Sequence, residues 1–337
     1  MRAIFLHRSC NSNCRQHYTL WDSCMRDPRP STMTATATTR RILVITLSNI
    51  GDAAMTTPVL AALHAQYPDA CIDLVCDPRS SALFAPCPYI GQLFVRNKQS
   101  GWRGYLQLIS ALRQTRYDIV VDLRTDFLVY LLRARRRLKK HSNASTLHMH
   151  SVEKHLLAVR TLVGHCLPNA ELWASEQDAQ VVVTQFPLSG RWLAIGPGAN
   201  FAGKVWPVER YAAVANALKA DFDGVVLLGG QADEALATQF VAQATLPVYN
   251  ACGGLTLPQS YALLRQCHFY LGNDSGLGHI AAAAGLTTLT LFGPGSPVRY
   301  RPWSPRASVI QDPQQDILGI TVQSVVAKLQ SLLMSAG

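Results

Sequence analysis

Residues 41–68 read RILVITLSNIGDAAMTTPVLAALHAQYP, and this stretch sets the pattern for most of the chain. The run ILVITL at 42–47 is apolar without interruption, which is typical of a strand buried on both faces of a parallel sheet. A short polar loop follows, and residues 55–67 then predict a helix, with Pro58 in its first turns and Pro68 just past its end. Strand, loop and helix in this order predict a βαβ unit.

The same alternation recurs along the chain. We expect further strands at 72–76, 92–96, 119–123, 192–196, 224–230, 268–272 and 288–292. We expect helices at 102–115, 127–140, 208–220, 232–244, 258–265, 276–284 and 322–334. Two runs of alternating strands and helices predict the α/β class, with two doubly wound, Rossmann-like lobes that face a central cleft.

The predicted domains follow from these two runs. Residues 1–40 form an extension that is disordered or mis-annotated, with Met33 as an alternative start. Residues 41–185 form the first lobe, 186–320 the second lobe and 321–337 a C-terminal helix. Cys10, Cys14, His17 and Cys24 have metal-binding side chains, but no helix or strand frames them, so we predict no metal site there.

Composition excludes several classes of protein. Hydrophobic residues make up 48% of the 337 positions and charged residues 15%, which excludes disorder over most of the length. No apolar run reaches the roughly 20 residues of a membrane span, and the N-terminus lacks a signal peptide. We therefore expect a cytoplasmic protein with reduced cysteines.

The positive charge is concentrated in the first half. Residues 41–190 carry 16 basic and 11 acidic side chains, whereas residues 191–337 carry 9 and 8. The nearly neutral second half argues against nucleic acid as a partner, and an anionic partner is expected to contact the first half.

One carboxylate follows the first predicted strand. The loop 48–52 lacks the pattern G-x-G-x-x-G, so no nicotinamide or flavin cofactor is expected, and we predict no cofactor at all. Asp52 would lie at the mouth of the cleft, where it is a candidate catalytic carboxylate or simply a helix cap.

Two segments of the second lobe suit a phosphate ligand. The glycine-rich loop 196–207 has Lys204 as its only cation, which suits a diphosphate, although a surface lysine is the alternative. The segment GNDSGLGH at 272–279 joins a strand to a helix whose free N–H groups and positive dipole end favour phosphate. Ser275 adds a hydroxyl and His279 an imidazole, unless Ser275 only caps the helix and His279 is packed in the core.

A basic cluster ends the predicted helix at 127–140. Its members are Arg133, Arg135, Arg136, Arg137, Lys139 and Lys140. A solvated helix end explains such a cluster in part. An anionic glycolipid or an anionic membrane surface is the alternative, and Arg133, Arg136 and Lys140 are the candidate acceptor-binding residues.

These motifs together resemble family 9 glycosyltransferases, the ADP-heptose:lipopolysaccharide heptosyltransferase group. The resemblance runs from about Arg41 to about Pro305. It rests on SNIGDA after the first strand, on P-G-x5-K-x-W-P at 197–207, on the Gly229-Gly230 pair before two acidic residues, on GNDSGLGH and on LFGP at 291–294. Residues 1–40 have no counterpart, and Ser275 stands where the best-known members have Thr.

The resemblance implies a GT-B fold and an inverting, metal-independent transfer of heptose, or a related sugar, from an ADP-sugar to a lipopolysaccharide core or similar glycolipid. It also implies that the enzyme associates peripherally with the cytoplasmic face of the inner membrane. Asp52 matches the general base and Lys204 the diphosphate-binding lysine. The donor loop matches Asp274, Ser275, Gly276, Leu277 and His279. Either Asp233 or Glu234 matches the ribose-binding acid.

The residues agree with a transfer that needs no metal. No D-x-D motif stands on a strand-end loop: Asp122 and Asp126 are too far apart, and Asp221 and Asp223 lie in a turn before a strand. Fixed dipoles and a cation are the alternative way to stabilise a leaving diphosphate. Two other functions stay open from the sequence, a sugar-nucleotide binding protein and an epimerase of the same architecture, although no clear acid/base pair for an epimerase stands out.

Overall fold

The computed structural model describes residues 41–124, 127–140, 146 and 148–336. The predictions for residues 1–40, which include the alternative start and the cysteine and histidine group, lie outside the described residues.

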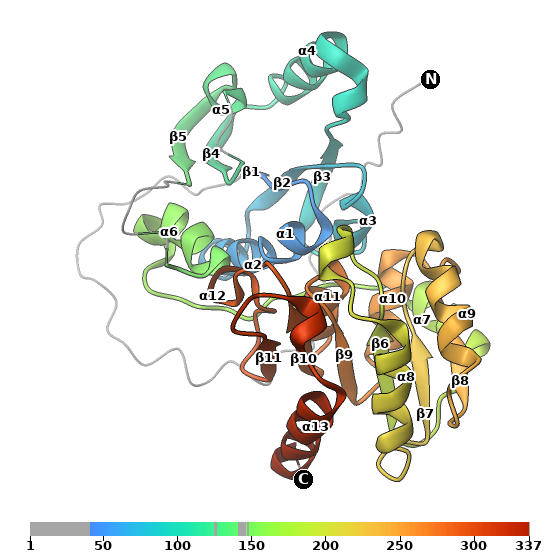
Figure 1. Cartoon of the computed structure of the whole chain (residues 1–337). Coiled ribbons are helices and arrows are strands. Elements are labelled where there is room, and N and C mark those ends of the chain that lie inside the picture. The colour runs from blue at the N-terminus through green and yellow to red at the C-terminus, as the bar shows by residue number, and fades with distance from the viewer. Residues whose placement is uncertain (1–40, 125–126, 141–145, 147, 337) are drawn as a thin grey trace.

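The first sheet has five strands, all parallel, in the order β3-β2-β1-β4-β5 (Figure 1). Its strands are β1 (Arg41–Ile45), β2 (Cys71–Cys76), β3 (Ile90–Val95), β4 (Tyr117–Asp122) and β5 (Ala134–Lys139). β1 is central, and Ile42 to Ile45 are 0% exposed, which explains why its sequence is an unbroken apolar run.

Helices cover both faces of this sheet. They are α1 (Ile50–Ala54), α2 (Thr57–Gln66), α3 (Ser81–Phe84), α4 (Gly101–Leu112), α5 (Leu128–Leu131) and α6 (Ser151–Val163), with the short η1 (Lys98–Ser100) before α4. Ile42 and Val44 of β1 pack in the core that holds α2 and α6, whereas Leu43 and Ile45 pack in the core that holds α4 and α5. Successive strand residues therefore serve opposite cores.

The second sheet has six parallel strands in the order β11-β10-β9-β6-β7-β8. Its strands are β6 (Trp192–Gly196), β7 (Gly224–Leu227), β8 (Val248–Asn250), β9 (Phe269–Asn273), β10 (Thr287–Phe292) and β11 (Ala307–Gln311). Its helices are α8 (Val208–Ala217), α9 (Glu234–Val241), α10 (Leu257–Leu264), α11 (Gly276–Ala283), α12 (Pro297–Tyr300) and α13 (Val322–Ala336), with the short η3 (Ala202–Lys204), η4 (Gln231–Asp233) and η5 (Ile317–Gly319). The α/β class with two parallel sheets is confirmed.

The two sheets are joined by several contacts. Helix α7 (Glu176–Gln185) packs against α10, and α1 packs against α11. One core cluster contains residues that line both sheets, for example Val44 of β1 and Tyr270 of β9. His150 Nε2 lies 2.9 Å from the carbonyl oxygen of Arg301. The boundary near residues 185 and 186 stays a prediction, and α7, which precedes it, packs against α10 of the second lobe.

The predicted helix at 127–140 is wrong over most of its length. Only Leu128–Leu131 is helical, and β5 follows as an edge strand paired with β4. The Arg137 side chain donates from Nε to Val129 O and from Nη2 to Leu132 O, so it holds the short helix against the strand. Exposed arginines suit an edge strand because charge there opposes pairing with another chain. The basic cluster therefore lies along a strand.

Several elements escaped prediction from the sequence. Besides β5, they are α1, whose residues were expected to be a loop, and α3, α6, α7, α12, β8 and β11. β8 has only three residues and β11 has none that is fully buried, so neither carries the continuous apolar run that marks the central strands.

We predict that His155 makes the fold sensitive to acid. The ring is buried on α6, with Nδ1 3.1 Å from the Met55 carbonyl oxygen, and burial lowers the pKa of His155 to about 3. Between pH 7 and pH 5 the unfolded chain takes up a proton on this histidine that the folded chain does not bind. The free energy of unfolding therefore decreases as the pH is lowered, by about 2 kcal/mol for such a group. His155→Gln keeps a donor for Met55 and should reduce that pH dependence.

Urea unfolding at pH 7 and at pH 5 measures the effect. His148→Gln is the matched control, because His148 is exposed. Equal loss of stability between the two pH values in the wild type and in His155→Gln would contradict the assignment.

Candidate functional site

The two lobes meet where α1 of the first contacts α11 of the second. A Cβ atom on Gly51 would lie 2.8 Å from Cδ2 of His279, and one on Gly276 would lie 2.9 Å from Cγ2 of Ile50. Glycine is therefore required at both positions for this close approach. α1 follows β1 and α11 follows β9, so the contact brings together the carboxyl ends of the two sheets, where ligands of such folds bind.

Asp52 is half-buried in the first turn of α1. The N-cap residue of this helix is Asn49, and the Asn49 side chain donates from Nδ2 to Oδ2 of Asp52 at 3.0 Å. Asp52 is therefore not the N-cap residue of this helix, which was the alternative to a catalytic role. A neighbouring amide orients one carboxylate oxygen in the region where the lobes meet.

Lys140 of the first lobe interacts electrostatically with Asp52. It directly follows β5, and its N–H donates to the carbonyl oxygen of Asp122 at 2.9 Å. Burial lowers the pKa of Lys140, while the charges of Asp52 and Asp122 oppose that shift. Lys154 of α6 and Arg299 of α12 interact with the same ammonium and also lower its pKa. Lys140 thus interacts electrostatically with Asp52 and with cations of two further elements.

The structure places Arg133 and Arg136 away from Lys140. Arg133 lies just before β5, at the end of the strand opposite Lys140, which is roughly 20 Å away along an extended chain. Arg136 is exposed in the middle of the strand. Of the three residues predicted to bind the acceptor, Lys140 is the one with an electrostatic interaction with Asp52, and acceptor binding by all three stays a prediction.

Lys204 and Asp274 form an ion pair on the second lobe. Lys204 Nζ lies 2.6 Å from Oδ2 of Asp274, and the two side chains are 25% and 9% exposed. The pair joins the glycine-rich loop after β6 to the loop after β9. The two residues expected at the donor site are thus brought together, and one face of the lysine remains open to solvent.

Asn273 fastens the glycine-rich loop, a role that the sequence did not reveal. Its Nδ2 donates to Pro197 O at 2.7 Å, and its Oδ1 accepts from the Trp206 N–H at 3.1 Å. Tyr211 Oη donates to the same oxygen at 2.8 Å. A fully buried amide thus holds both ends of the loop that carries Lys204. An Asn ending an otherwise apolar strand was the available signal.

The start of α11 has no side-chain cap among the described residues. Ser275 is its N-cap residue, but the Ser275 hydroxyl makes no capping hydrogen bond. Asp274 instead binds Lys204. The hydroxyls of Tyr270 and Ser275 are both buried with no hydrogen-bond partner among the described residues, and burial raises the pKa of Tyr270. Leu277, like Gly276, is half-buried in the first turn. A helix start without a side-chain cap suits an anionic ligand.

His279 is packed between the lobes. Its ring edge faces Gly51, and its Nδ1 is buried with no hydrogen-bond partner among the described residues. Burial lowers the pKa of His279 to about 4, and the charges of His150 and Lys204 act in the same direction. The imidazole is therefore neutral at pH 7. The ring contributes polar atoms rather than a positive charge.

Asp233 and Glu234 lie against different loops. Oδ2 of Asp233 accepts from the Gly230 N–H at 2.9 Å. Oδ1 of Asp233 lies only 1.9 Å from the position that a Cβ atom on Gly198 would take. Glu234 is exposed, and its Oε1 lies 2.4 Å from the Cβ position of Gly253, in the loop after β8. Asp233 is thus next to the loop of Lys204, and Glu234 is farther along the sheet.

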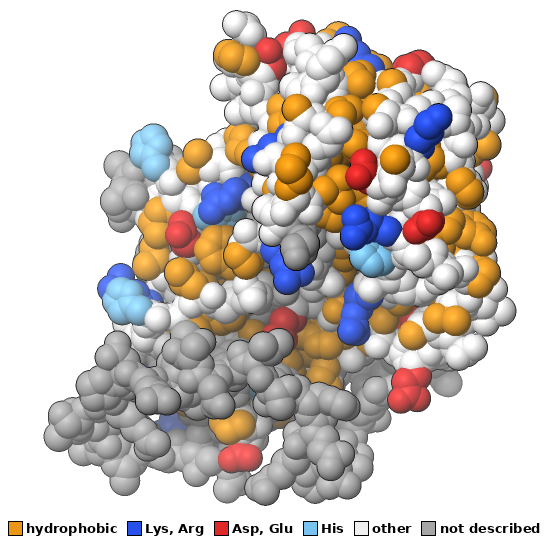
Figure 2. All heavy atoms as spheres, turned by 90° about the horizontal axis from the view of Figure 1, so that it is seen from below, with side chains coloured by type: hydrophobic (Ala, Val, Ile, Leu, Met, Phe, Trp, Pro, Cys, Tyr) orange, Lys and Arg blue, Asp and Glu red, His pale blue; other side chains and the backbone are white. Residues whose placement is uncertain are grey.

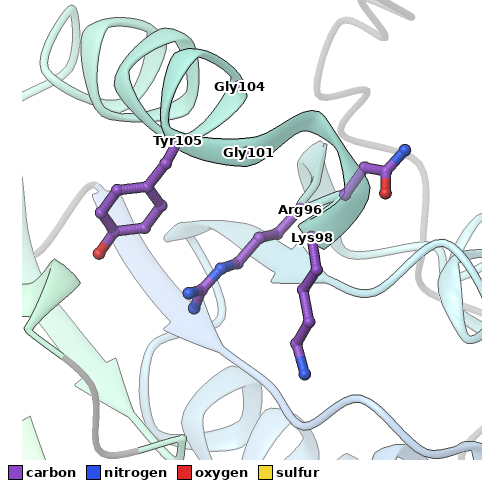
Figure 3. A pocket seen from close by; sticks show the side chains of 6 residues that line it. Arg96, Lys98, Gly101, Gly104 and Tyr105 are labelled. Carbon is purple, nitrogen blue, oxygen red and sulfur yellow. The ribbon is translucent and has the colours of Figure 1, made fainter.

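The first lobe holds a second group of cations that sequence reasoning missed. Arg96, Lys98 and Tyr105 line a shallow pocket of about 150 Å³ between the end of β3 and the start of α4 (Figure 3). The Arg96 guanidinium lies 5.0 Å from the centre of the Tyr105 ring. Farther along the same edge, Arg124 donates to Ser48 Oγ. The available signal was a cation at the end of one predicted strand, Arg96, and one directly after another, Arg124.

The family model for glycosyltransferase family 9 (heptosyltransferase) matches residues 105–321. The lipopolysaccharide heptosyltransferase 3 of Escherichia coli is 30% identical over 285 residues, which are 75% of this chain and 84% of that protein. The lipopolysaccharide heptosyltransferase 2 of Salmonella typhimurium is 29% identical over 346 residues, with 88% and 99% covered.

Solved structures show the same fold. The structure of the E. coli ADP-heptose lipopolysaccharide heptosyltransferase II has a TM-score of 0.74 and 27% identity, and the match covers 88% of this chain and 99% of that one. The E. coli heptosyltransferase WaaC with ADP has a TM-score of 0.71 at 19% identity, over 87% and 99% of the two chains. Family and fold expectations are thus confirmed: the chain belongs to glycosyltransferase family 9 and is a glycosyltransferase with the GT-B fold.

Proposed function

We propose that this protein is an inverting heptosyltransferase that uses ADP-heptose as donor and an anionic glycolipid of the lipopolysaccharide core as acceptor. We further propose that it works without a metal ion, at the cytoplasmic face of the inner membrane. The main support is the contact of α1 with α11, in which a carboxylate of one lobe lies near the uncapped helix start of the other. The curated relatives named above are lipopolysaccharide heptosyltransferases by name.

On the donor side, the second lobe would stabilise the leaving diphosphate. The bond between the anomeric carbon and the diphosphate oxygen breaks, and its electron pair leaves with ADP. The negative charge that grows on this oxygen is stabilised by Lys204 and by the first-turn N–H groups of α11. Asp274 already holds Lys204 in place, so the ammonium needs little reorientation when the donor binds.

On the acceptor side, Asp52 would act as the general base. An acceptor hydroxyl attacks the anomeric carbon from the face opposite the diphosphate, and its proton passes to the Asp52 carboxylate. Attack from that face inverts the configuration. Lys140 provides positive charge near Asp52, and Lys154 and Arg299 add positive charge around Lys140, which favours a carboxylate- or phosphate-bearing acceptor.

We predict that Asp52→Asn slows transfer by about 10²–10⁴-fold, because the amide cannot accept the proton. ADP-heptose binding should be unchanged, since the donor contacts lie on the second lobe. Release of ADP in the presence of a lipopolysaccharide acceptor measures the rate, and calorimetry measures binding. Asp69→Asn, an exposed carboxylate in a turn of the same lobe, is the control. Near-normal turnover of Asp52→Asn would remove Asp52 from the mechanism.

We predict the same rate of transfer in EDTA as in buffer with magnesium. No group of three or more His, Cys, Asp or Glu side chains within the described ranges is arranged to hold a metal ion. Lys204 and the α11 N-terminus would supply the stabilisation that a metal otherwise gives. Loss of activity after chelation, restored by Mg²⁺ or Mn²⁺, would refute metal independence.

We predict that Lys204→Gln weakens ADP-heptose binding and turnover together. Gln keeps a donor for Asp274 but removes the charge, and a charge-assisted contact of this kind contributes roughly 1.5–3 kcal/mol. Lys219→Gln, an exposed lysine of the same lobe, is the control. Calorimetry with ADP and with ADP-heptose tests the change in affinity, and wild-type affinity in Lys204→Gln would show that the donor binds elsewhere.

The same assays separate the two alternatives raised by the sequence. A binding protein would hold ADP-heptose without releasing ADP. An epimerase would convert the sugar without an acceptor. No further observation favours either function over transfer.

A further inference from the structure

Helices α4 and α5 expose large apolar side chains on the outer face of the first lobe. Trp102 and Leu106 of α4 are 69% and 53% exposed. Phe127 at the start of α5 is 80% exposed, and Tyr130 and Leu131 are 59% and 45% exposed. Three of the four exposed aromatic side chains among the described residues thus lie on this one face. Scattered exposed hydrophobic residues are ordinary, but a group of aromatic ones indicates an interaction surface.

These side chains form one surface. Below them, α4 and α5 pack on a common core that contains only residues of the first lobe. Between them, a shallow pocket is lined by Leu106, Ile109 and Arg113 of α4 and by Arg133 before β5. Both helices lie at the top of Figure 1, away from the second sheet. We call the face formed by Trp102, Leu106, Phe127, Tyr130 and Leu131 the α4–α5 surface.

The two segments that form the α4–α5 surface carry only basic charged side chains. Residues 96–116 contain five Lys and Arg, residues 127–140 contain six, and neither segment contains Asp or Glu. Asp118 lies between the two segments in the sequence, and its Oδ1 is 3.6 Å from Nη1 of Arg135. On the face seen from below, by contrast, acidic and basic side chains are interspersed (Figure 2). The α4–α5 surface is therefore apolar and basic.

Cations lie directly over its aromatic rings. The Arg103 guanidinium lies 5.5 Å from the centre of the Trp102 ring, and Lys139 Nζ lies 4.6 Å from that of Tyr130. Aromatic residues prefer the layer between lipid headgroups and acyl chains, and adjacent cations bind anionic headgroups. No helix within the described part of the chain is long and apolar enough to cross a membrane, so contact would be confined to the surface.

We propose that the α4–α5 surface docks the enzyme on an anionic lipid bilayer. Trp102, Phe127 and Tyr130 enter the headgroup layer, and the flanking arginines and lysines contact lipid phosphates. α4 follows β3 and α5 follows β4, so both start at the sheet edge that also carries Asp52. Docking there turns the acceptor side of the cleft toward the bilayer. This inference rests on the proposed function, because a glycolipid acceptor is held in a membrane.

Co-sedimentation with vesicles tests the proposal. The full chain is mixed with vesicles of phosphatidylglycerol and phosphatidylethanolamine, or of phosphatidylcholine alone, none of which contains the acceptor. We expect binding only to the anionic vesicles, reduced at high salt. The double variant Trp102→Ser, Phe127→Ser and the double variant Arg103→Gln, Arg113→Gln should each bind at least tenfold more weakly. Met334→Ser and Lys219→Gln, exposed positions of the second lobe, are the matched controls.

A second assay separates this proposal from the proposed function. Transfer to a water-soluble core oligosaccharide without acyl chains should be the same in the wild type and in both double variants. If the wild type transfers to that acceptor but does not bind anionic vesicles, or if both double variants bind them normally, the docking proposal is overturned. If no protein transfers to any acceptor, the proposed function fails instead. A dimer that the same substitutions dissociate, without vesicle binding, would make this face a protein interface and also overturn the proposal.

Discussion

The contact of Gly51 with His279 and of Gly276 with Ile50 constrains everything else at the site. Each side chain larger than hydrogen at these glycines would collide with the opposite lobe. Because α1 and α11 approach so closely, groups that follow strands of two different sheets share one environment. The same contact buries His279 and keeps its imidazole neutral at pH 7. The packing of the two lobes therefore also determines the chemistry of the site.

The two lobes supply charge in different ways. The second lobe is nearly neutral in sequence and combines one lysine with an uncapped helix start. Asn273 holds the loop of that lysine, and Asp274 holds the lysine itself. Removing a partner from such a buried pair costs more than the pair contributes, so its value here is in orientation rather than in stability. The first lobe instead carries many cations, which is consistent with an anionic acceptor and an anionic surface.

The basic run 133–140 shows how one stretch of sequence serves two purposes. As an edge strand it alternates its side chains between the faces of the sheet. Arg137 and Lys139 contact α5 and its Tyr130, whereas Lys140 follows the end of the strand and interacts electrostatically with Asp52. A helix would have distributed these charges around its axis and would not have extended one of them to the carboxyl edge of the sheet.

The sequence by itself determined the α/β class, the central strands and the loops that carry the candidate site. Buried parallel strands need unbroken apolar runs, as in β1, and the glycine-rich loops need residues that few other contexts favour. The tertiary structure alone decided that 133–140 is a strand, because pairing with β4 is not encoded in the local pattern of an exposed, charged segment. It also decided that Lys204 pairs with Asp274, that Asn273 fastens the loop and that His279 meets Gly51, more than two hundred positions earlier. Such contacts depend on how two sheets pack, and no local spacing records that.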